Sequence, residues 1–306
     1  MKSLVVDGTN IAMRSLKAAE RSAPLSINVD DEEIPTGPTY LFINTFTKYV
    51  RQEAPDRLVV CWDGGRSRHR MSIYSGYKSQ RPKSDDGGVK DLNFRLIKEF
   101  LTLSGIHHIE YEGIEADDLV AAYSRSGSKE GEVVILSGDK DFLQLVGERV
   151  SQIRPGVNPE RWGPTEVENM MGCTPENLVK VMALAGDPQD GVPGVQGFGM
   201  KTAVKFLTKY EWDLEALLAA GEKKLEGKEG EVRRNYALVD LRHPIEGYLE
   251  DAYLPHFRVP KAGDVLYYDL TTWLRVYQMD SILNRLQDGT LWKDPDPRRF
   301  QGRLAL

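Results

Sequence analysis

The sequence has 306 residues, 41% hydrophobic and 28% charged, which is enough for one large core or two smaller ones. Its 46 acidic residues outnumber 40 lysines and arginines, so the net charge of −6 argues against a nucleic-acid partner unless the acids are concentrated in one metal site. The sequence lacks an apolar membrane span of about 20 residues, a signal peptide and the cysteines of a disulfide framework or zinc site, so we expect a cytoplasmic protein with no membrane partner.

Apolar runs alternate with helical patterns along the first 160 residues. The patterns predict strands at 3–6, 58–62, 106–111, 133–136 and 150–153, and helices at 11–19, 39–53, 92–104 and 115–124. Residues 21–38 contain three prolines and four consecutive acids, so we predict a surface loop there. The alternation favours an α/β fold, with a mostly parallel central sheet flanked by helices.

Acidic residues follow the predicted strands or open the helices after them. Because parallel strands end at one edge of a sheet, we expect these carboxylates to lie together. Carboxylates repel one another unless a cation lies between them, and Mg²⁺ or Mn²⁺ prefers oxygen ligands. Helix caps and solvated loop ends are the alternative interpretation. With two acids from a later loop, the set is Asp7, Asp63, Glu115, Asp117, Asp118, Asp139, Asp141, Asp187 and Asp190. Nine acids without nearby His or Cys ligands suit a pair of divalent ions and phosphodiester hydrolysis.

A basic segment follows Asp63 and has no acidic residue between 64 and 83. Mixed cationic and tyrosine side chains suit phosphate contact and base stacking, although a mobile solvated loop is the alternative. Its position favours a flap, or arch, over the acidic site at about 64–92, where Lys78 and Arg81 would polarise a phosphate. The other candidate contacts in this segment are Arg66, Arg68, Arg70, Tyr77 and Lys83.

The pattern becomes helical after residue 160. We predict helices from 165, at 174–185, 200–209, 211–221 and 232–241, and a final helix at 267–286. Gly194, Gly197 and Gly199 form a loop before the helix at 200, where free backbone N–H groups and Lys201 would bind phosphate. We therefore predict a core at 1–160, and a helical DNA-binding region at 161–306 that includes a C-terminal helical extension.

Six segments, in this order, resemble the 5′-nuclease superfamily of phage 5′→3′ exonucleases and flap endonucleases and the 5′-nuclease domain of bacterial DNA polymerase I. They are 5–8 (VVDG) with Arg14, 62–64 (WDG), 77–82 (YKSQRP), 115–118 (EADD), 137–142 (SGDKDF) and 186–203. The resemblance implies a PIN-like or resolvase-like sheet followed by a SAM-like helix–three-turn–helix at about 175–209. It also implies a hydrolase that cleaves phosphodiester bonds as a 5′→3′ exonuclease and flap endonuclease.

The resemblance implies two metal positions. Asp7, Asp63, Glu115, Asp117, Asp118 and Asp139 would serve the first, and Asp141, Asp187 and Asp190 the second, with K⁺ as a further ion at 192–197. Lys78 and Arg81 would contact the scissile phosphate, with Asp7, Asp63, Asp117 and Asp139 as the other catalytic residues. Tyr77 would stand at the arch gateway. Further DNA contacts would come from Arg14, Arg66, Arg68, Arg70, Lys83, Gly194, Gly197, Gly199 and Lys201.

The expected partners are branched or nicked duplex DNA, 5′ flaps, RNA–DNA primers and replication proteins, bound by a monomer in the cytoplasm (the host cytoplasm if the protein is of phage origin). The sequence departs from the family pattern in three places, namely the acidic stretch within 21–38, the Asp and Gly pairs at 85–88, and everything beyond about 245. Two alternatives stay open: a PIN-like ribonuclease, which would not need the glycine loop, and a DNA-structure binding protein without catalysis.

Overall fold

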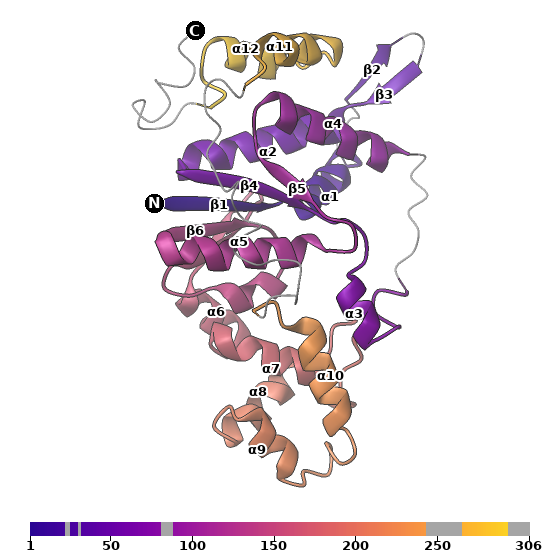
Figure 1. The fold of residues 1–306 in the computed structure, drawn as a ribbon, viewed down its shortest axis with the longest axis vertical. Coiled ribbons are helices and arrows are strands. Elements are labelled where there is room, and N and C mark those ends of the chain that lie inside the picture. Colours follow the sequence, from indigo (N-terminus) through magenta and orange to yellow (C-terminus); the bar gives the residue numbers. More distant parts are fainter. Residues whose placement is uncertain (22–24, 30–31, 81–87, 243–264, 293–306) are drawn as a thin grey trace.

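A six-stranded sheet forms the centre of the molecule (Figure 1). The computed structural model describes residues 1–21, 25–29, 32–80, 88–242 and 265–292. The strand order is β5-β4-β1-β6-β7-β8, and all neighbouring strands are parallel except β7 and β8. The strands are β1 (Lys2–Asp7), β4 (Arg57–Trp62), β5 (His108–Glu110), β6 (Glu132–Leu136), β7 (Val150–Arg154) and β8 (Glu160–Trp162). The predicted mostly parallel sheet is confirmed.

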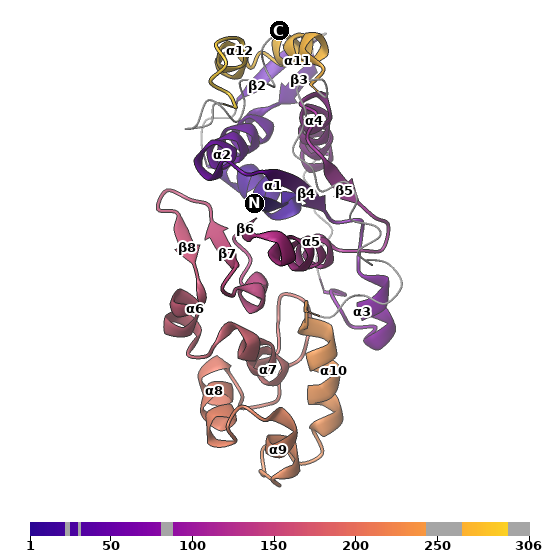
Figure 2. The same cartoon turned by 60° about the vertical axis from the view of Figure 1, so that its left-hand side comes forward.

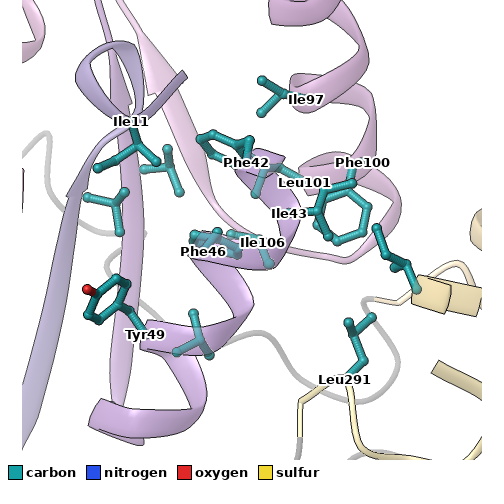
Figure 3. Close-up of a cluster of buried hydrophobic side chains, with 14 of the residues drawn as sticks. Ile11, Phe42, Ile43, Phe46, Tyr49, Ile97, Phe100, Leu101, Ile106 and Leu291 are labelled. Carbon is teal, nitrogen blue, oxygen red and sulfur yellow. The ribbon is translucent and has the colours of Figure 1, made fainter. Parts of the chain in front are cut away.

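Helices cover both faces of this sheet. Because side chains alternate along a strand, Leu4 and Val6 of β1 point to one face and Val5 to the other, and all three are fully buried. The helices α1 (Gly8–Ala19), α2 (Gly37–Glu53) and α4 (Val89–Leu103) pack on the Leu4 face, and α5 (Ala116–Glu130) packs on the Val5 face. Figure 3 shows Phe42 and Phe46 of α2 and Phe100 of α4 in the apolar cluster that covers the Leu4 face of the sheet.

The chain reverses its direction across the sheet between β5 and β6. It runs from β1 outward through β4 to β5, and then returns through α5 to place β6 on the other side of β1. In such sheets ligands bind beyond the carboxyl ends of the strands where the order reverses. This position lies just after Asp7, where β1 ends, and after Leu136, where β6 ends.

A separate group of helices lies below the sheet in Figures 1 and 2. Its members are α6 (Pro164–Met171), α7 (Pro175–Ala185), α8 (Met200–Lys209), α9 (Leu214–Ala219) and α10 (Glu229–Val239). They enclose their own apolar cluster around α7. The short 3₁₀ helix η1 (Asp141–Leu145) joins the two parts, because Phe142 packs beneath the sheet and Leu143 packs with α7.

Two segments differ from the expected secondary structure. The predicted loop at 21–38 contains an antiparallel hairpin of β2 (Ser26–Val29) and β3 (Glu32–Pro35), in which Ile27 lies opposite Ile34 and is buried. The base of the basic segment forms α3 (Arg68–Ile73), since the Ser67 hydroxyl caps the backbone N–H of Arg70. Residues 81–87, which include the acidic pair expected to interrupt the arch, lie outside the described residues.

The C-terminal helices pack on the α/β core, which corrects their assignment to the helical DNA-binding region. The predicted helix at 267–286 is two helices, α11 (Tyr267–Val276) and α12 (Asp280–Gln287), separated at Gln278 by a positive φ of 50°. Leu274 and Ile282 join the cluster formed by α2 and α4. Figures 1 and 2 show α11 and α12 at the opposite end of the molecule from α6–α10. No helix in the described ranges has both the length and the apolar composition of a membrane span.

The packing of α11 generates a stability prediction. Leu274 is fully buried, so Leu274→Ala should lower the free energy of unfolding by about 2–5 kcal/mol. The neighbouring Arg275 is exposed, and Arg275→Ala should change it by about 0.5 kcal/mol or less. Urea denaturation followed by circular dichroism measures both variants, and equal stabilities would show that α11 is not part of the core.

Candidate functional site

Asp7 lies at the centre of the acidic edge of the sheet. It ends β1 and caps α1, because its Oδ1 accepts a hydrogen bond from the Asn10 N–H at 2.9 Å. Its Oδ2 accepts a second bond from the Ser137 hydroxyl, at 2.8 Å, at the end of β6. Burial raises the pKa of Asp7 to about 7, and the charges of Asp63 and Asp139 contribute to the rise. Asp7 therefore shares one electrostatic environment with two acids that are distant in sequence.

Asp63 connects β4 to the start of α5. Its backbone N–H donates to the Thr9 hydroxyl at 3.0 Å, and its Oδ1 accepts a hydrogen bond from the Ala116 N–H at 2.7 Å. A carboxylate is favoured there by the unpaired N–H groups of the helix start. The contact brings Asp63 beside Asp117, which lies in the first turn of α5.

Asp117 and Asp139 complete the first acidic group, which consists of Asp7, Asp63, Asp117 and Asp139. Burial raises the pKa of Asp117 well above its usual value, the Lys78 charge opposes this rise, and the other three acids of the group add to it. The backbone N–H of Asp139 donates to the Ser137 hydroxyl at 3.0 Å, so Ser137 positions both Asp7 and Asp139.

The second acidic group consists of Asp141, Asp187 and Asp190, which are all half-buried. One carboxylate oxygen from each lies within 4.8 Å of the others. Burial raises the pKa of Asp141, and Asp139 and the two other members of the group raise it further. The Asp139 carboxylate also accepts the Asp141 N–H at 3.0 Å, so Asp139 belongs beside both groups. Asp187 and Asp190 come from the loop between α7 and α8. This group therefore joins the sheet to the helices α6–α10, which are called the helical region from here on.

Lys78 lies between the two acidic groups. Its ammonium donates to Glu115 Oε1 at 2.8 Å and lies 3.3 Å from Asp190 Oδ2, while its backbone N–H donates to the Asp190 carbonyl at 2.8 Å. Burial alone would lower the pKa of Lys78, but the charges of Asp117, Glu115 and Asp190 raise it overall. A Cβ at Gly191 would lie 3.0 Å from the carbonyl oxygen of residue 76, so this glycine lets the two loops approach closely.

Arg70 is part of the structure of the site, which corrects its assignment to DNA binding. It is 4% exposed, and its guanidinium donates to Asp118 Oδ1 at 2.7 Å and Oδ2 at 2.8 Å. It also donates to Glu115 Oε2 at 3.1 Å and to the Leu238 carbonyl of α10 at 2.9 Å. Since Arg70 occupies both oxygens of the buried Asp118, the assignment of Asp118 as a metal ligand is corrected as well.

Tyr77 also differs from its expected role. Its side chain is 2% exposed, and its hydroxyl donates to Glu115 Oε2 at 2.7 Å and lies 3.1 Å from Asp190 Oδ2. A buried ring cannot stack on a nucleic-acid base, so Tyr77 holds the acids in place and is not a gateway aromatic. Both carboxylate oxygens of Glu115 thus have partners, with Lys78 at Oε1 and Arg70 and Tyr77 at Oε2. Glu115 belongs to neither acidic group and lies next to them.

Of the remaining predicted contacts, Arg14 lies at the acidic edge, because a Cβ on Gly138, the residue before Asp139, would be 2.9 Å from its guanidinium. Arg66 is exposed, Arg68 pairs with Glu112 at the surface, and the half-buried Arg14 donates to the Pro155 carbonyl at 2.5 Å. Gly197, Gly199 and Lys201 are exposed on the loop and helix start before α8. Gly194 packs against α7, where a Cβ would lie 2.0 Å from the Ala185 carbonyl. Arg81 and Lys83 lie outside the described residues.

Three polar residues that the sequence analysis missed position the acids and the glycine loop. Ser137 holds Asp7 and Asp139, and Asn10 Oδ1 accepts the Gly138 N–H at 3.0 Å. Asn235 of α10 is fully buried and donates to the Ala183 and Pro193 carbonyls at 3.1 and 2.6 Å, on either side of the loop turn. A serine and an asparagine next to strand-end acids were the available signals for the first two, whereas the resemblance of residues 233–241 to a later helix of the family did not indicate what Asn235 contacts.

The donor set of the two groups fits hard divalent cations. All seven members are carboxylates, and neither group contains a histidine or cysteine among the described residues. Burial is the main cause of the raised pKa values of Asp7, Asp117 and Asp141, and bound cations would relieve the charge repulsion that adds to it. Within the described ranges, the second group has the spacing of a cation site, because one oxygen from each of its three members lies within 4.8 Å of the others, and Asp139 lies beside it.

Two family models match consecutive parts of the chain. Residues 2–172 match the 5′-3′ exonuclease N-terminal resolvase-like domain, and residues 173–255 match the 5′-3′ exonuclease C-terminal SAM fold. A 5′-3′ exonuclease of Aquifex aeolicus is 37% identical over 247 residues, which cover 79% of this chain and 82% of the relative. DNA polymerase I of Bacillus subtilis is 34% identical over 74% of this chain, and this chain spans 26% of its length.

A solved structure with the same fold is the flap endonuclease of bacteriophage T5, determined as a pseudo-enzyme-product complex with DNA and metal ions. The two chains superpose with a TM-score of 0.66 and 19% sequence identity, covering 91% of this chain and all of the phage chain. The superposition includes both the sheet and the helical region.

The buried ion pairs generate a matched mutational prediction. Arg70→Met should lower the free energy of unfolding by about 3–5 kcal/mol, because it leaves Asp118 buried without a partner. Arg68→Met removes an exposed pair and should cost about 1 kcal/mol or less. Chemical denaturation of both variants compares them directly, and similar losses would contradict a specific role for the buried Arg70.

The raised pKa values generate a pH prediction. Burial raises the pKa of Asp7 from 3.8 to about 7, so at intermediate pH the folded protein binds a proton that the unfolded chain has released. In a chelator, the melting temperature should therefore fall as the pH rises from about 5.5 to about 7.5. Asp7→Asn should flatten this slope. A wild-type melting temperature that rises over the same range would contradict the expected sign.

Proposed function

The chain belongs to the 5′-3′ exonuclease family, and we propose that it is a divalent-metal-dependent, structure-specific 5′ nuclease that acts on branched or nicked DNA and on 5′ flaps. The observation that carries this proposal is the pair of carboxylate groups that share Asp139 and lie beside a glycine loop between two helices. Family membership supports 5′→3′ exonuclease activity, and the fold shared with the phage flap endonuclease supports action on flaps.

Mg²⁺ or Mn²⁺ ions are the proposed cofactors. Asp7, Asp63, Asp117 and Asp139 would hold one ion, and Asp141, Asp187 and Asp190 a second, with Glu115 behind them. Two such ions supply positive charge for the attacking and leaving oxygens of an in-line displacement at phosphorus. K⁺ at 192–197 is a further proposal, supported by the family resemblance of the glycine loop.

Lys78 is the proposed phosphate-contacting cation of this chain. Its ammonium is 6% exposed and is bound to Glu115 and Asp190, so it must exchange a carboxylate for the phosphate when substrate enters. The exchange conserves a charge-assisted hydrogen bond and places the cation at the charge that develops during cleavage. Arg81 and Lys83 belong to the same proposal as contacts from the arch.

The helical region at 161–242 is the proposed grip on duplex DNA. Gly197, Gly199 and Lys201 are exposed beside the start of α8, where backbone N–H groups favour phosphate oxygens. This region adjoins the second acidic group through the loop that holds Asp187 and Asp190, so a duplex bound there would reach the acids. RNA–DNA primers, replication proteins, a monomeric state and action in the cytoplasm complete the proposal. A PIN-like ribonuclease is not favoured, because it would not need the helical region.

A single carboxamide substitution tests the proposed function. Asp139→Asn should reduce the rate of cleavage of a 5′-flap duplex with Mg²⁺ by about a hundredfold or more, because Asp139 lies beside both groups. Glu148 is exposed outside both groups, and Glu148→Gln should retain the wild-type rate. The measurement is single-turnover cleavage of a labelled flap, with an RNA strand of the same sequence alongside. Full cleavage by Asp139→Asn, or cleavage of RNA in preference to the flap, would overturn the proposal.

A further inference from the structure

A groove of about 900 Å³ begins at the acidic edge of the sheet and follows α4. Its lining residues on α4 extend from Lys90 to Leu103, a distance of about 20 Å along the helix. At one end it is bounded by Thr9 and Asp63, a member of the first acidic group. At the other end it is bounded by Trp273 of α11, which lies beyond residue 255, where the family models end. The groove is therefore continuous with the proposed active site, and α11 helps to form it.

Phe94 is the partly exposed ring of this groove, with Lys90 and Lys98 nearby, and Trp62 lies buried next to it at 1% exposed. The rings of Trp62 and Phe94 lie 5.6 Å apart between centroids, in a tilted arrangement. The Lys90 ammonium lies 5.7 Å from the Phe94 ring centroid, and the Lys98 ammonium lies 5.2 Å from the Trp62 ring centroid. Single-stranded nucleic acid is bound by an accessible ring with cations beside it, because bases stack on the ring and the cations hold the phosphates, and Phe94 with its neighbouring cations has this arrangement.

The acids of the groove are mostly paired within it. Glu110 pairs with Lys98, and Glu99 accepts the Trp273 indole N–H at 3.0 Å. Asp91 lies in the first turn of α4, where the helix start offsets its charge. Lys90 has no carboxylate partner among the described residues, and Arg95 is exposed, with its guanidinium 3.9 Å from Glu99. Two cations are thus available at the rim for phosphate groups.

The groove and the helical region lie on opposite sides of the acids. Asp63 adjoins the groove, whereas Asp187 and Asp190 adjoin the helical region. Figure 1 shows α4 above the sheet and α7–α10 below it. A strand that leaves a duplex held by the helical region would therefore pass both acidic groups before it reaches the groove.

We infer that the groove along α4 binds the single-stranded 5′ nucleotides that lie beyond the scissile phosphate. Phe94 offers a stacking surface for a base, and Lys90 and Arg95 contact the phosphates. This inference rests on the proposed function, because it requires a substrate with a single-stranded 5′ end. It assigns a substrate-binding role to α4 and α11, and it makes affinity depend on the length of the 5′ single strand.

The test compares a blunt duplex with the same duplex carrying a 5′ single-stranded extension of about four nucleotides, both in EDTA so that neither is cleaved. The extension should tighten binding to the wild type roughly tenfold in fluorescence anisotropy. Lys90→Glu combined with Arg95→Glu should remove this gain and leave the affinity for the blunt duplex unchanged. The matched control combines Lys17→Glu with Lys129→Glu, two exposed lysines that do not line the groove, and it should keep the gain.

A second readout reports on stacking. A 2-aminopurine base within the extension should lose fluorescence on binding to the wild type and lose less on binding to Phe94→Leu, whose fold is checked by thermal melting. The inference is overturned if the extension adds no affinity, if the charge-reversed variant keeps the gain, or if Phe94→Leu quenches as fully as the wild type. Cleavage of a nicked duplex with Mg²⁺ separates the two proposals: its absence refutes the proposed function, whereas cleavage without an extension effect refutes only the groove.

Discussion

The charge balance at the carboxyl edge of the sheet is the constraint on which the rest of this structure depends. Carboxylates from five segments of the chain meet there, and burial raises the pKa values of Asp7, Asp117 and Asp141. Arg70 and Lys78 supply the positive charges that the described residues place against them. Both come from the basic segment after β4, so buried ion pairs hold this segment against the acids. Arg70 also binds the Leu238 carbonyl, so the same charge balance holds α10 of the helical region against α3 and α5.

The sequence predicts the acids of the sheet edge well, because a simple rule controls them. Asp7, Asp63 and Asp139 each follow an apolar run, and parallel strands bring such residues to one edge. The rule fails for Asp118, which differs from Asp117 by one position. Successive residues on a helix point about 100° apart, so Asp117 faces the first acidic group while Asp118 faces Arg70. Which of two adjacent acids joins the acidic group and which meets an arginine depends on partners that the local pattern does not show.

The fold was predictable where periodicity is strong and local, and less so where long-range packing decides. The apolar stripe of α11 predicts a buried helix correctly, but a stripe does not say which of two cores will cover it. Trp273 and Leu274 pack beside Phe100 of α4, far from the helices that precede them in the sequence. The hairpin of β2 and β3 was missed for a related reason, since the prolines and acids around Ile27 and Ile34 resemble a loop, and the cross-strand pair forms only after the chain turns back.

The position of α11 and α12 makes the first core discontinuous in sequence. Leu4 and Phe46 share one apolar cluster with Leu274 and Trp292, and the helices α6–α10 are an insertion between these parts. During synthesis the sheet and its first helices leave the ribosome well before the segment that completes their outer layer. The helical region, whose cluster is drawn mostly from the residues between Leu143 and Val239, is nearly complete at an earlier stage. The nascent chain therefore carries an unfinished apolar surface over α2 and α4 until residues 267–292 emerge, and chaperones have an opportunity to bind there.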